Sequence, residues 1–323
     1  MNVGVIGLGV GERHVSALQN FNKVKKILVT DFNRRKLDEI VSSYSKTEKS
    51  SEDQIMNDHS IDLIVIASFD QYHSNQVITA IENKKHVFVE KPICLTEEEL
   101  SKIKAAYLEN QEIQISSNFI LRKENRFINL KREIDSGKMG KIYYIEATYD
   151  YGRLDKIING WRGEIEHYSV MLGGGIHLLD LMTWITGAKI KDSYGLGSKF
   201  HTRKTKFIGP DLAVALLELE GGIIGKITAN FASSTPHFHQ LKFYGSKGTF
   251  IHDCNEGRYF FDRDTSSTMT PDKHSFPSTS KGDLLIDFVN SIINKKPHYP
   301  GFNQILELMD GCFMVDKSLK LIK

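Results

Sequence analysis

The first fourteen residues of this 323-residue chain constrain its fold more than any other segment. A short apolar run at residues 3–6 leads directly into three glycines within five residues, and then into a segment with helical patterning. In such a strand–turn–helix segment, glycine lets the turn close tightly and lets the backbone approach a pyrophosphate, which binds the free N–H groups of the helix. We therefore predict a dinucleotide site, although similar glycine turns also occur where no nucleotide binds. Its predicted contacts are Gly7, Leu8, Gly9, Val10 and Gly11.

A second apolar strand, residues 26–30, ends at Asp31. An acidic side chain about 20 residues after the glycines is placed to accept hydrogen bonds from an adenosine ribose. Because its charge would repel a 2′-phosphate, Asp31 favours NAD, whereas the neighbouring Arg34 and Arg35 leave NADP possible. The turn reads G-x-G-x-G, one residue shorter than the usual fingerprint, so the prediction depends on the strand, the glycines and Asp31 together.

The first 119 residues alternate between apolar strands and helical segments. Residues 62–67 and 86–90 each contain an uninterrupted run of apolar side chains, as buried parallel strands do. One of the intervening helices is predicted to start at Thr96, where Glu99 closes a capping box. This alternation predicts an α/β fold with a Rossmann-type, doubly wound parallel sheet in a dinucleotide-binding domain of residues 1–119.

From residue 120 onward the pattern changes to strands with two unlike faces. Residues 142–151 alternate with a period of two, and the glycines at residues 221–222 and 245–248 predict hairpin turns. We predict an α+β substrate-binding and oligomerisation domain for residues 120–323, with a large, mostly antiparallel open sheet. Its predicted helices are residues 125–136, 174–186, 283–293 and 303–321.

The composition argues against several classes of partner. With a formal net charge of +2, the chain gives no reason to expect nucleic acid or an anionic membrane as a partner. No apolar run approaches the ~20 residues of a membrane helix, and the apolar start lacks the basic leader of a signal peptide. Cys94, Cys254 and Cys312 are scattered, without metal-ligand spacing, and are expected to be thiols. We therefore expect a cytoplasmic protein.

Five segments in chain order carry the motifs of one enzyme family. Residues 67–73 read Ala-Ser-Phe-Asp-Gln-Tyr-His, residues 87–92 read Val-Phe-Val-Glu-Lys-Pro, and residues 177–181 read His-Leu-Leu-Asp-Leu. Together with residues 245–249 and 287–292, they resemble the glucose–fructose oxidoreductase, inositol dehydrogenase and rhizopine catabolism (GFO/IDH/MocA) family of nicotinamide-dependent oxidoreductases. The resemblance extends over essentially the whole chain.

The resemblance assigns roles to residues at two strand ends. It implies that Lys91 orients the substrate and assists proton transfer, that Glu90 orients Lys91, and that Pro92 is in cis. Independently of the family, Lys91 follows a buried strand at the carboxyl edge of a parallel sheet, where ligands bind. An isolated Lys-Pro pair is more often a surface turn. Ser68 and Phe69 stand where the family has threonine and proline. The implied cofactor contacts are Ser68, His73, Glu90 and Lys91.

His177 is the second candidate catalytic residue. Three glycines precede it, and histidine is the side chain best suited to moving a proton at neutral pH, although a core histidine bound to a backbone group is the alternative. Asp180, at i+3, is expected to be mainly a structural partner. Members of the family usually carry an acid four residues before this histidine, where this chain has Gly173. Either Lys91 and His177 act alone, or the replacement comes from the preceding loop, whose candidates are Glu164, Glu166, His167 and Tyr168.

Candidate substrate contacts follow the last strand of the first domain and continue into the next strand and loop. Arginine forks bind phosphate or carboxylate, and aromatic faces stack on sugars or bases. This cluster suggests a sugar or nucleotide-sugar substrate, although an ordinary strand face and loop explain it equally well. His237 and His239 could form part of a metal site, but with no third ligand evident we expect solvent-exposed histidines and no metal. The candidate substrate contacts are Asn118, Arg122, Tyr149, Trp161, Arg162, Tyr168 and Asp180.

The sequence thus predicts an NAD(P)-dependent oxidoreductase. Hydride would pass between the nicotinamide and a hydroxyl or ketone of a sugar, cyclitol or nucleotide sugar. The absence of an acid at Gly173 keeps two alternatives open: a cofactor-binding protein without net redox activity, with a regulatory or scaffold role, or an enzyme using NAD transiently for elimination. The resemblance also implies a homodimer or homotetramer formed through the open sheet face.

Overall fold

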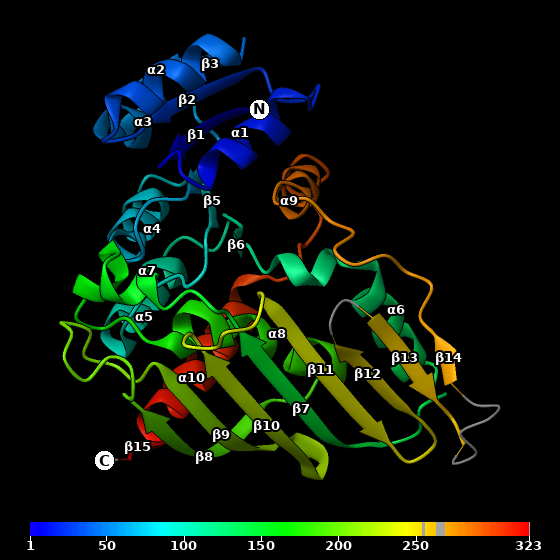
Figure 1. Ribbon diagram of the computed structural model, residues 1–323. Helices are drawn as coiled ribbons and strands as arrows, with labels where there is room; N and C mark the ends of the chain where they lie inside the picture. The colour runs from blue at the N-terminus through cyan, green and yellow to red at the C-terminus, as the bar shows by residue number, and fades with distance from the viewer. Residues whose placement is uncertain (254–255, 263–268, 323) are drawn as a thin grey trace. The chain divides into compact units, whose positions relative to one another are not determined.

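The computed structural model describes residues 1–253, 256–262 and 269–322, which form two compact units (Figure 1). The N-terminal unit contains residues 1–120 and 280–306, and the C-terminal unit contains the other described residues. The sequence analysis assigned all of residues 120–323 to the second domain, whereas the structure counts residues 280–306 with the first. Cys254 lies outside the described residues.

The N-terminal unit contains a six-stranded sheet in which every pair of neighbours is parallel. The strand order is β3-β2-β1-β4-β5-β6, so the direction of winding reverses between β1 and β4, where open α/β sheets bind ligands. This confirms the predicted doubly wound parallel sheet. Its strands are β1 (Asn2–Ile6), β2 (Lys26–Thr30), β3 (Thr47–Lys49), β4 (Leu63–Ile66), β5 (His86–Val89) and β6 (Ile115–Ser117).

Helices and a short 3-10 turn connect these strands. Thr96 caps α5 by accepting a hydrogen bond from the Glu99 N–H, and the Glu99 carboxylate accepts one from Thr96 N–H in return, as the sequence predicted. The helices are α1 (Gly11–Gln19), α2 (Arg34–Ser43), α3 (Glu52–Asn57), α4 (His73–Glu82), α5 (Glu97–Leu108) and α9 (Asp283–Ile293), with η1 (Asp70–Tyr72) before α4.

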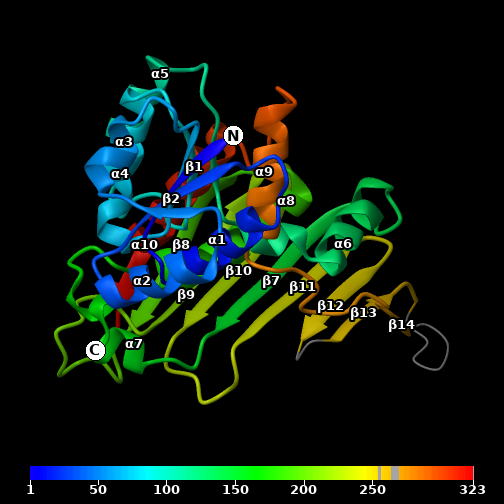
Figure 2. The ribbon, with the colours of Figure 1, turned by 90° about the horizontal axis from the view of Figure 1, so that it is seen from above.

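Helix α9 belongs to the N-terminal unit because it completes that unit's core. It packs beside α1 (Figure 2), and its Leu284, Leu285 and Phe288 are fully or almost fully buried in one cluster with Val15 and Leu18 of α1. An amphipathic helix must bury its apolar face against another element, and α9 does so on this sheet although it lies more than 160 residues later in the chain.

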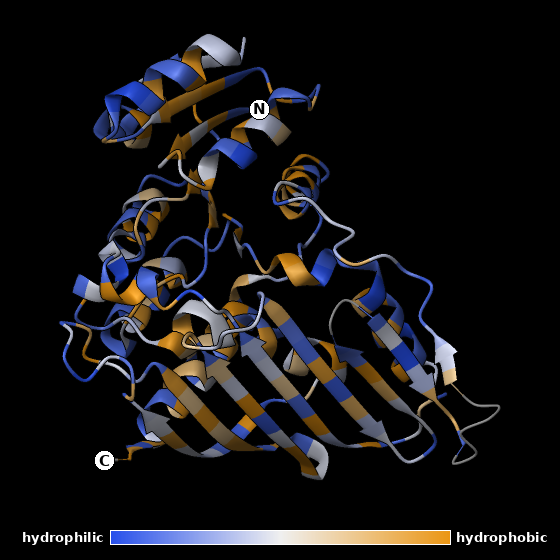
Figure 3. Cartoon of the chain, viewed as in Figure 1, coloured by the Kyte–Doolittle hydropathy of each residue, from blue (hydrophilic) through white to orange (hydrophobic). Residues whose placement is uncertain are grey.

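The C-terminal unit contains a mixed nine-stranded sheet, ordered β14-β13-β12-β11-β7-β10-β9-β8-β15. The β7–β10 and β8–β15 pairs are parallel and the remaining pairs are antiparallel, which confirms the mostly antiparallel expectation. Apolar and polar bands alternate along these strands in Figure 3. The strands are β7 (Ile142–Asp150), β8 (Ile190–Ser198), β9 (Leu212–Leu219), β10 (Ile223–Asn230), β11 (Phe238–Gly245), β12 (Thr249–Asp253), β13 (Glu256–Phe260), β14 (Met269–Pro271) and β15 (Leu319–Leu321).

Helices cover one face of this sheet: α8 packs on β7, and α6 packs on α8. On the other face, Tyr194, Leu216 and Ile224 are more than half exposed. No helix in the described ranges is long and apolar enough to cross a membrane. The helical segments are η2 (Ile120–Lys123), α6 (Asn125–Asp135), α7 (Asp155–Ile158), η3 (Trp161–Glu164), the π-helix η4 (Met171–Gly175), α8 (Ile176–Thr186), η5 (Glu220–Gly222) and α10 (Phe302–Ser318).

The predicted helix over residues 303–321 is wrong at its end. Helix α10 stops at Ser318, and residues 319–321 form β15, which pairs in parallel with Gly195–Gly197 of β8. A side chain at Gly195 would approach the Leu319 side chain to 2.6 Å, so the glycines of β8 make room for the added strand. Backbone groups at the edge of a sheet gain hydrogen bonds when another strand pairs with them. Helix propensity is a local property, so it does not predict this pairing.

Candidate functional site

The three glycines after β1 differ in their surroundings. Gly7 has φ +87°, and a Cβ there would lie 2.5 Å from the carbonyl oxygen of Ala67 at the end of β4. A Cβ at Gly11 would lie 3.3 Å from the Ala67 and Val5 side chains. Gly9, in contrast, is exposed, and a Cβ there would meet nothing within 4 Å. Two glycines therefore close the turn against the sheet, and the middle one leaves the backbone open to a ligand.

The turn leads into a helix start with uncapped backbone donors. Val10 is the N-cap of α1, and no side chain caps this end. Free N–H groups and the positive end of a nine-residue helix suit a pyrophosphate. The residues of the turn therefore fit a dinucleotide.

Asp31 connects the end of β2 to the glycine turn. Its Oδ2 accepts a hydrogen bond from Leu8 N–H at 2.6 Å, and its Oδ1 accepts one from Asn33 N–H at 2.7 Å. The Leu8 side chain is fully buried in the core of the unit. Asp31 is thus fixed at the carboxyl edge of the sheet, in the position predicted for ribose binding.

Glu90 lies at the centre of a buried polar network at the end of β5. Its Oε1 accepts hydrogen bonds from His14 Nε2 at 2.8 Å and from Asn118 Nδ2 at 2.7 Å. Burial disfavours the carboxylate, but the hydrogen bond and charge of His14, the Asn118 amide and the Lys91 charge outweigh burial and lower the pKa of Glu90. Glu90 is therefore held as an anion immediately before Lys91.

His14, which is fully buried on α1, is not among the site residues predicted from the sequence. Its imidazole meets Phe88 edge-on, with ring centroids 5.5 Å apart. The sequence did offer a signal for His14, because it is a polar side chain among the apolar positions of a short helix. A polar group buried there normally has a hydrogen-bond partner.

His73 connects the two loops that carry the family-like motifs. Its Nδ1 lies 2.7 Å from the Pro92 carbonyl oxygen, and its Nε2 lies 3.3 Å from the Ser68 carbonyl oxygen. The Lys91–Pro92 bond is cis, as the resemblance implied. The Ser68 hydroxyl donates to Gln76 Oε1 at 2.6 Å. In this structure, the His73 side chain therefore binds backbone carbonyl groups, and the Ser68 side chain binds a side chain of α4.

Arg122 and Asp180 bind each other in the C-terminal unit. Arg122 Nε lies 2.9 Å and its Nη2 2.6 Å from the Asp180 carboxylate oxygens, and both side chains are almost fully buried. The Arg122 guanidinium also lies 5.6 Å from the centre of the Trp184 ring. The pair joins η2 to α8.

His177 is the second residue of α8, directly after the π-helix, a distortion that often marks functional sites. The Tyr149 ring stacks at 6.4 Å from His177, and His237 and His239 lie 5.1 and 5.2 Å from Tyr149. The ring centroids of His239 and His177 are also 6.2 Å apart. The segment that carries His237 and His239 therefore lies next to the candidate catalytic residue His177. His237 is exposed and His239 is half-buried. No metal-binding group of three or more His, Cys, Asp or Glu occurs among the described residues.

The loop before α8 contains the remaining predicted contacts. The Arg162 guanidinium lies over the Trp161 ring at 4.1 Å and 5.8 Å from the Tyr168 ring, and Tyr168 itself is 4% exposed. Burial raises the pKa of Tyr149. Burial acts in the same direction on Tyr151, but hydrogen bonds and charges from Lys156 and Arg153 lower its pKa.

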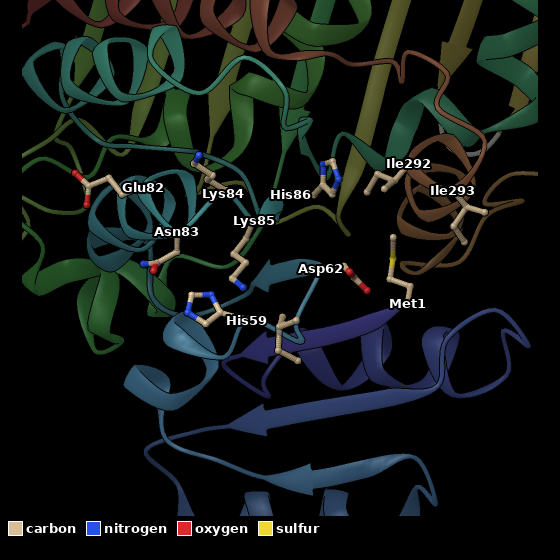
Figure 4. Close-up of a pocket in the computed structure, with 11 residues that line it drawn as sticks. Met1, His59, Asp62, Glu82, Asn83, Lys84, Lys85, His86, Ile292 and Ile293 are labelled. Carbon is tan, nitrogen blue, oxygen red and sulfur yellow. The ribbon is translucent and has the colours of Figure 1, made fainter.

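A surface hollow of about 690 Å³ lies at the opposite, amino edge of the parallel sheet (Figure 4). Met1, His59, Asp62 and Lys85 are among the residues that line it. The Lys85 amino group donates to the Asp58 carbonyl oxygen at 2.7 Å, and burial lowers the pKa of Lys85. Ligands of open α/β sheets bind at the carboxyl ends of the strands, so this hollow is not the predicted dinucleotide site.

Two family models match most of the chain. Residues 1–119 match the model described as an oxidoreductase family with an NAD-binding Rossmann fold, and residues 127–251 match the GFO/IDH/MocA C-terminal domain. The chain belongs to the GFO/IDH/MocA family. It is therefore an oxidoreductase with an NAD-binding domain, as the sequence predicted.

Inositol dehydrogenases are among the relatives of this GFO/IDH/MocA protein. It is 28% identical over 254 residues to scyllo-inositol 2-dehydrogenase (NAD(+)) of Bacillus subtilis, covering 76% of this chain and 72% of the relative. It is 25% identical over 265 residues to myo-inositol 2-dehydrogenase of Thermotoga maritima, covering 78% and 75%. The solved structure of scyllo-inositol dehydrogenase from Lactobacillus casei with bound NAD(H) and scyllo-inositol has a TM-score of 0.81 at 20% identity, covering 99% and 96%. The last comparison shows the shared fold.

Proposed function

We propose that this protein is an NAD-dependent dehydrogenase or reductase for a hydroxyl or ketone group of a cyclitol, sugar or nucleotide sugar. The observation that carries the proposal is the turn at Gly9, which is open to a ligand and tied to Asp31 at the carboxyl edge of the parallel sheet. The inositol dehydrogenases among its relatives support the substrate class. When bound, the nicotinamide supplies the hydride acceptor or donor.

In this proposal Lys91 binds the reacting oxygen of the substrate. The Glu90 carboxylate, fixed by His14 and Asn118, orients the neighbouring Lys91 ammonium. An ammonium at that oxygen stabilises the negative charge that develops when the hydroxyl proton leaves. His177, in the C-terminal unit, takes part in moving the proton that the substrate hydroxyl gives up. Ser68 and His73 support the cofactor site by holding the loops around it.

Three aromatic side chains beside Asp31 support the choice of dinucleotide. Phe32 is 80% exposed and Tyr72 is 52% exposed, and both flank Phe69, at ring distances of 5.3 and 6.5 Å. Exposed aromatic faces at the ends of β2 and β4 suit stacking on an adenine base. The Asp31 charge favours NAD, whereas Arg34 remains exposed and Arg35 pairs with Glu39 at 3.2 Å.

Gly173 favours one further candidate, a family member that binds the dinucleotide without net redox chemistry. The position where relatives usually carry an acid offers no side chain here. Such a protein would bind NADH but would show no change in reduced-nicotinamide absorbance with any polyol or sugar. An NAD-assisted elimination would instead give a product lighter than the substrate by one water.

The same proposal includes a homo-oligomer in a reducing cytosolic compartment. The open face of the nine-stranded sheet exposes apolar side chains that a second copy could cover. Cys94 and Cys312 are buried, and we expect them to remain thiols in a reducing compartment.

The first experiment is calorimetric titration of the protein with NADH and NADPH, followed by rate measurements on inositols, sugars and nucleotide sugars. We expect tighter binding of NADH and turnover of at least one polyol. Absence of binding by either dinucleotide would contradict the proposal.

Lys91→Met separates the catalytic role from binding. We expect a loss of turnover of about 10²-fold or more with an NADH Kd within about threefold, because Lys91 would act on the substrate oxygen. Lys104→Met, at an exposed position of α5, is the matched control and should keep full activity. An unchanged rate for Lys91→Met would contradict the assigned role.

A further inference from the structure

Gly173 and Tyr168 occupy one space in the C-terminal unit. A Cβ at residue 173 would overlap the phenol oxygen and Cζ of Tyr168, and would lie 3.0 Å from its Cε2. Real Cβ atoms do not approach other atoms so closely, so a side chain at residue 173 and the present position of the Tyr168 ring exclude each other. In this chain, the absence of a side chain at residue 173 is therefore what leaves room for the Tyr168 ring.

The phenol oxygen is held close to the chain segment that leads into His177. Gly173 lies in the π-helix η4, and His177 follows four residues later at the start of α8. The Gly173 N–H donates to the Ser169 carbonyl oxygen at 2.9 Å, which fixes the backbone between Tyr168 and the π-helix. The phenol oxygen therefore lies where the side chain of residue 173 would begin, about one turn before His177.

The ring of Tyr168 is fixed by its neighbours. It is 4% exposed and meets Phe207 edge-on, with centroids 6.3 Å apart. The Arg162 guanidinium lies 5.8 Å from the ring centre, so negative charge developing on the phenol oxygen would be stabilised electrostatically. A buried phenol with a nearby cation is suited to accept or donate a proton.

We propose that Tyr168 is a catalytic residue of this enzyme and that its phenol oxygen takes the role of the acid that the family resemblance leads one to expect at Gly173. This inference rests on the proposed function. In the oxidative direction, the substrate hydroxyl loses its proton to the Tyr168 phenolate, and the nicotinamide, when bound, would accept the hydride from the substrate carbon. A carbonyl group and a neutral Tyr168 result. The proton then passes to His177 or to water, and the reductive direction reverses these steps.

A phenol and a carboxylate predict different pH dependences. A carboxylate is ionised above pH ~4, whereas a phenol in water ionises near pH ~10. With Tyr168 as the base, the oxidation rate rises with pH through the ionisation of the phenol. Tyr168→Phe removes only the oxygen and should abolish that rise while preserving the packing.

The test compares Tyr168→Phe with Tyr143→Phe, an exposed tyrosine on β7. We expect Tyr168→Phe to lower kcat by about 10²–10⁴-fold, with Tm and NADH Kd unchanged. Tyr143→Phe should match the unaltered protein. Full activity of Tyr168→Phe would overturn the proposal, as would a loss of activity that tracks a fall in Tm.

Stability measurements test, without any assay of activity, whether the Tyr168 ring occupies the space of a side chain at residue 173. Gly173→Ala should lower Tm when Tyr168 is present and should leave it unchanged in a Tyr168→Ala background. Combining Tyr168→Ala with Gly173→Asp should recover part of the activity lost by Tyr168→Ala. An equal effect of Gly173→Ala in both backgrounds would overturn the geometric basis. Absence of turnover in the unaltered protein would contradict the proposed function itself, and this proposal with it.

Discussion

Gly7, Gly9 and Gly11 differ in what a side chain at each position would meet. Gly7 needs a positive φ and has the Ala67 carbonyl against it, whereas Gly9 faces open space. The sequence predicts a turn at these residues because glycine spacing is a local signal. It does not distinguish the residues that close the turn from the one that faces the ligand, because that difference depends on β4, sixty residues later.

Alanine substitutions separate stability from binding in this turn. Gly7→Ala should lower the free energy of unfolding by about 2–4 kcal/mol, because it combines a left-handed backbone with a steric clash. Gly9→Ala should leave stability unchanged and weaken NADH binding by about tenfold, because the methyl group would meet the pyrophosphate. Thermal denaturation and calorimetric titration of both variants check these outcomes. If the two variants were equally stable and bound NADH equally well, the assigned roles of Gly7 and Gly9 would be contradicted.

Helix α10 carries a carboxyl group that burial keeps protonated. Burial raises the pKa of Asp316 to about 7, although a hydrogen bond donated by the Ser169 hydroxyl at 2.6 Å opposes the rise. Its other oxygen, Oδ1, is buried and has no hydrogen-bond partner in the part of the chain that the structure describes. Burial of an oxygen without a partner disfavours the carboxylate more than the neutral carboxyl group.

The free energy of unfolding should therefore depend on whether Asp316 is protonated. An unfolded aspartate ionises near pH ~3.9, so between about pH 4 and pH 7 the folded protein binds the extra proton. Stability contributed by this group is lost as the pH rises through that range. Asp316→Asn should remove the loss and raise the free energy of unfolding at pH ~8 by about 4 kcal/mol. Denaturant unfolding at several pH values measures this, with Asp310→Asn, exposed on the same helix, as control. An unchanged pH dependence in Asp316→Asn would contradict the assignment.

At the scale of elements, the sequence predicts long periodic segments and misses short ones. The parallel strands β1, β2, β4 and β5 and the capped helix α5 are visible because their apolar runs and caps are local. Strands of three residues, such as β3 and β15, cannot display a period, and β15 depends on pairing with β8. His14 was missed for a similar reason, because its partner Glu90 lies 76 residues away.

The open face of the nine-stranded sheet is the surface through which we propose that copies of the whole molecule associate. Tyr194, Leu216 and Ile224 lie on neighbouring strands of this face and are each more than half exposed. Isologous burial of the same face in two copies would remove this apolar surface from water.

Charged substitutions test this association. Combining Leu216→Lys with Ile224→Lys should shift the protein from dimer or tetramer to monomer, because two desolvated ammonium groups would oppose burial. Sedimentation velocity measures the change. Leu108→Lys, at an exposed position of α5, should leave the assembly unchanged. A monomeric unaltered protein would contradict the oligomer proposal.

Helix α9 also affects the order in which the chain can acquire its structure. The first 120 residues leave the ribosome with an unfinished core, because Leu284, Leu285, Phe288 and Val289 are synthesised more than 160 residues later. Until then, the apolar surface around Val15 and Phe88 has no cover and is a target for chaperones and for aggregation. The cofactor-binding half of this protein therefore cannot be cut out as an independent module. A frameshift between residues 120 and 284 would remove this helix and damage the nucleotide site that residues 3–14 begin.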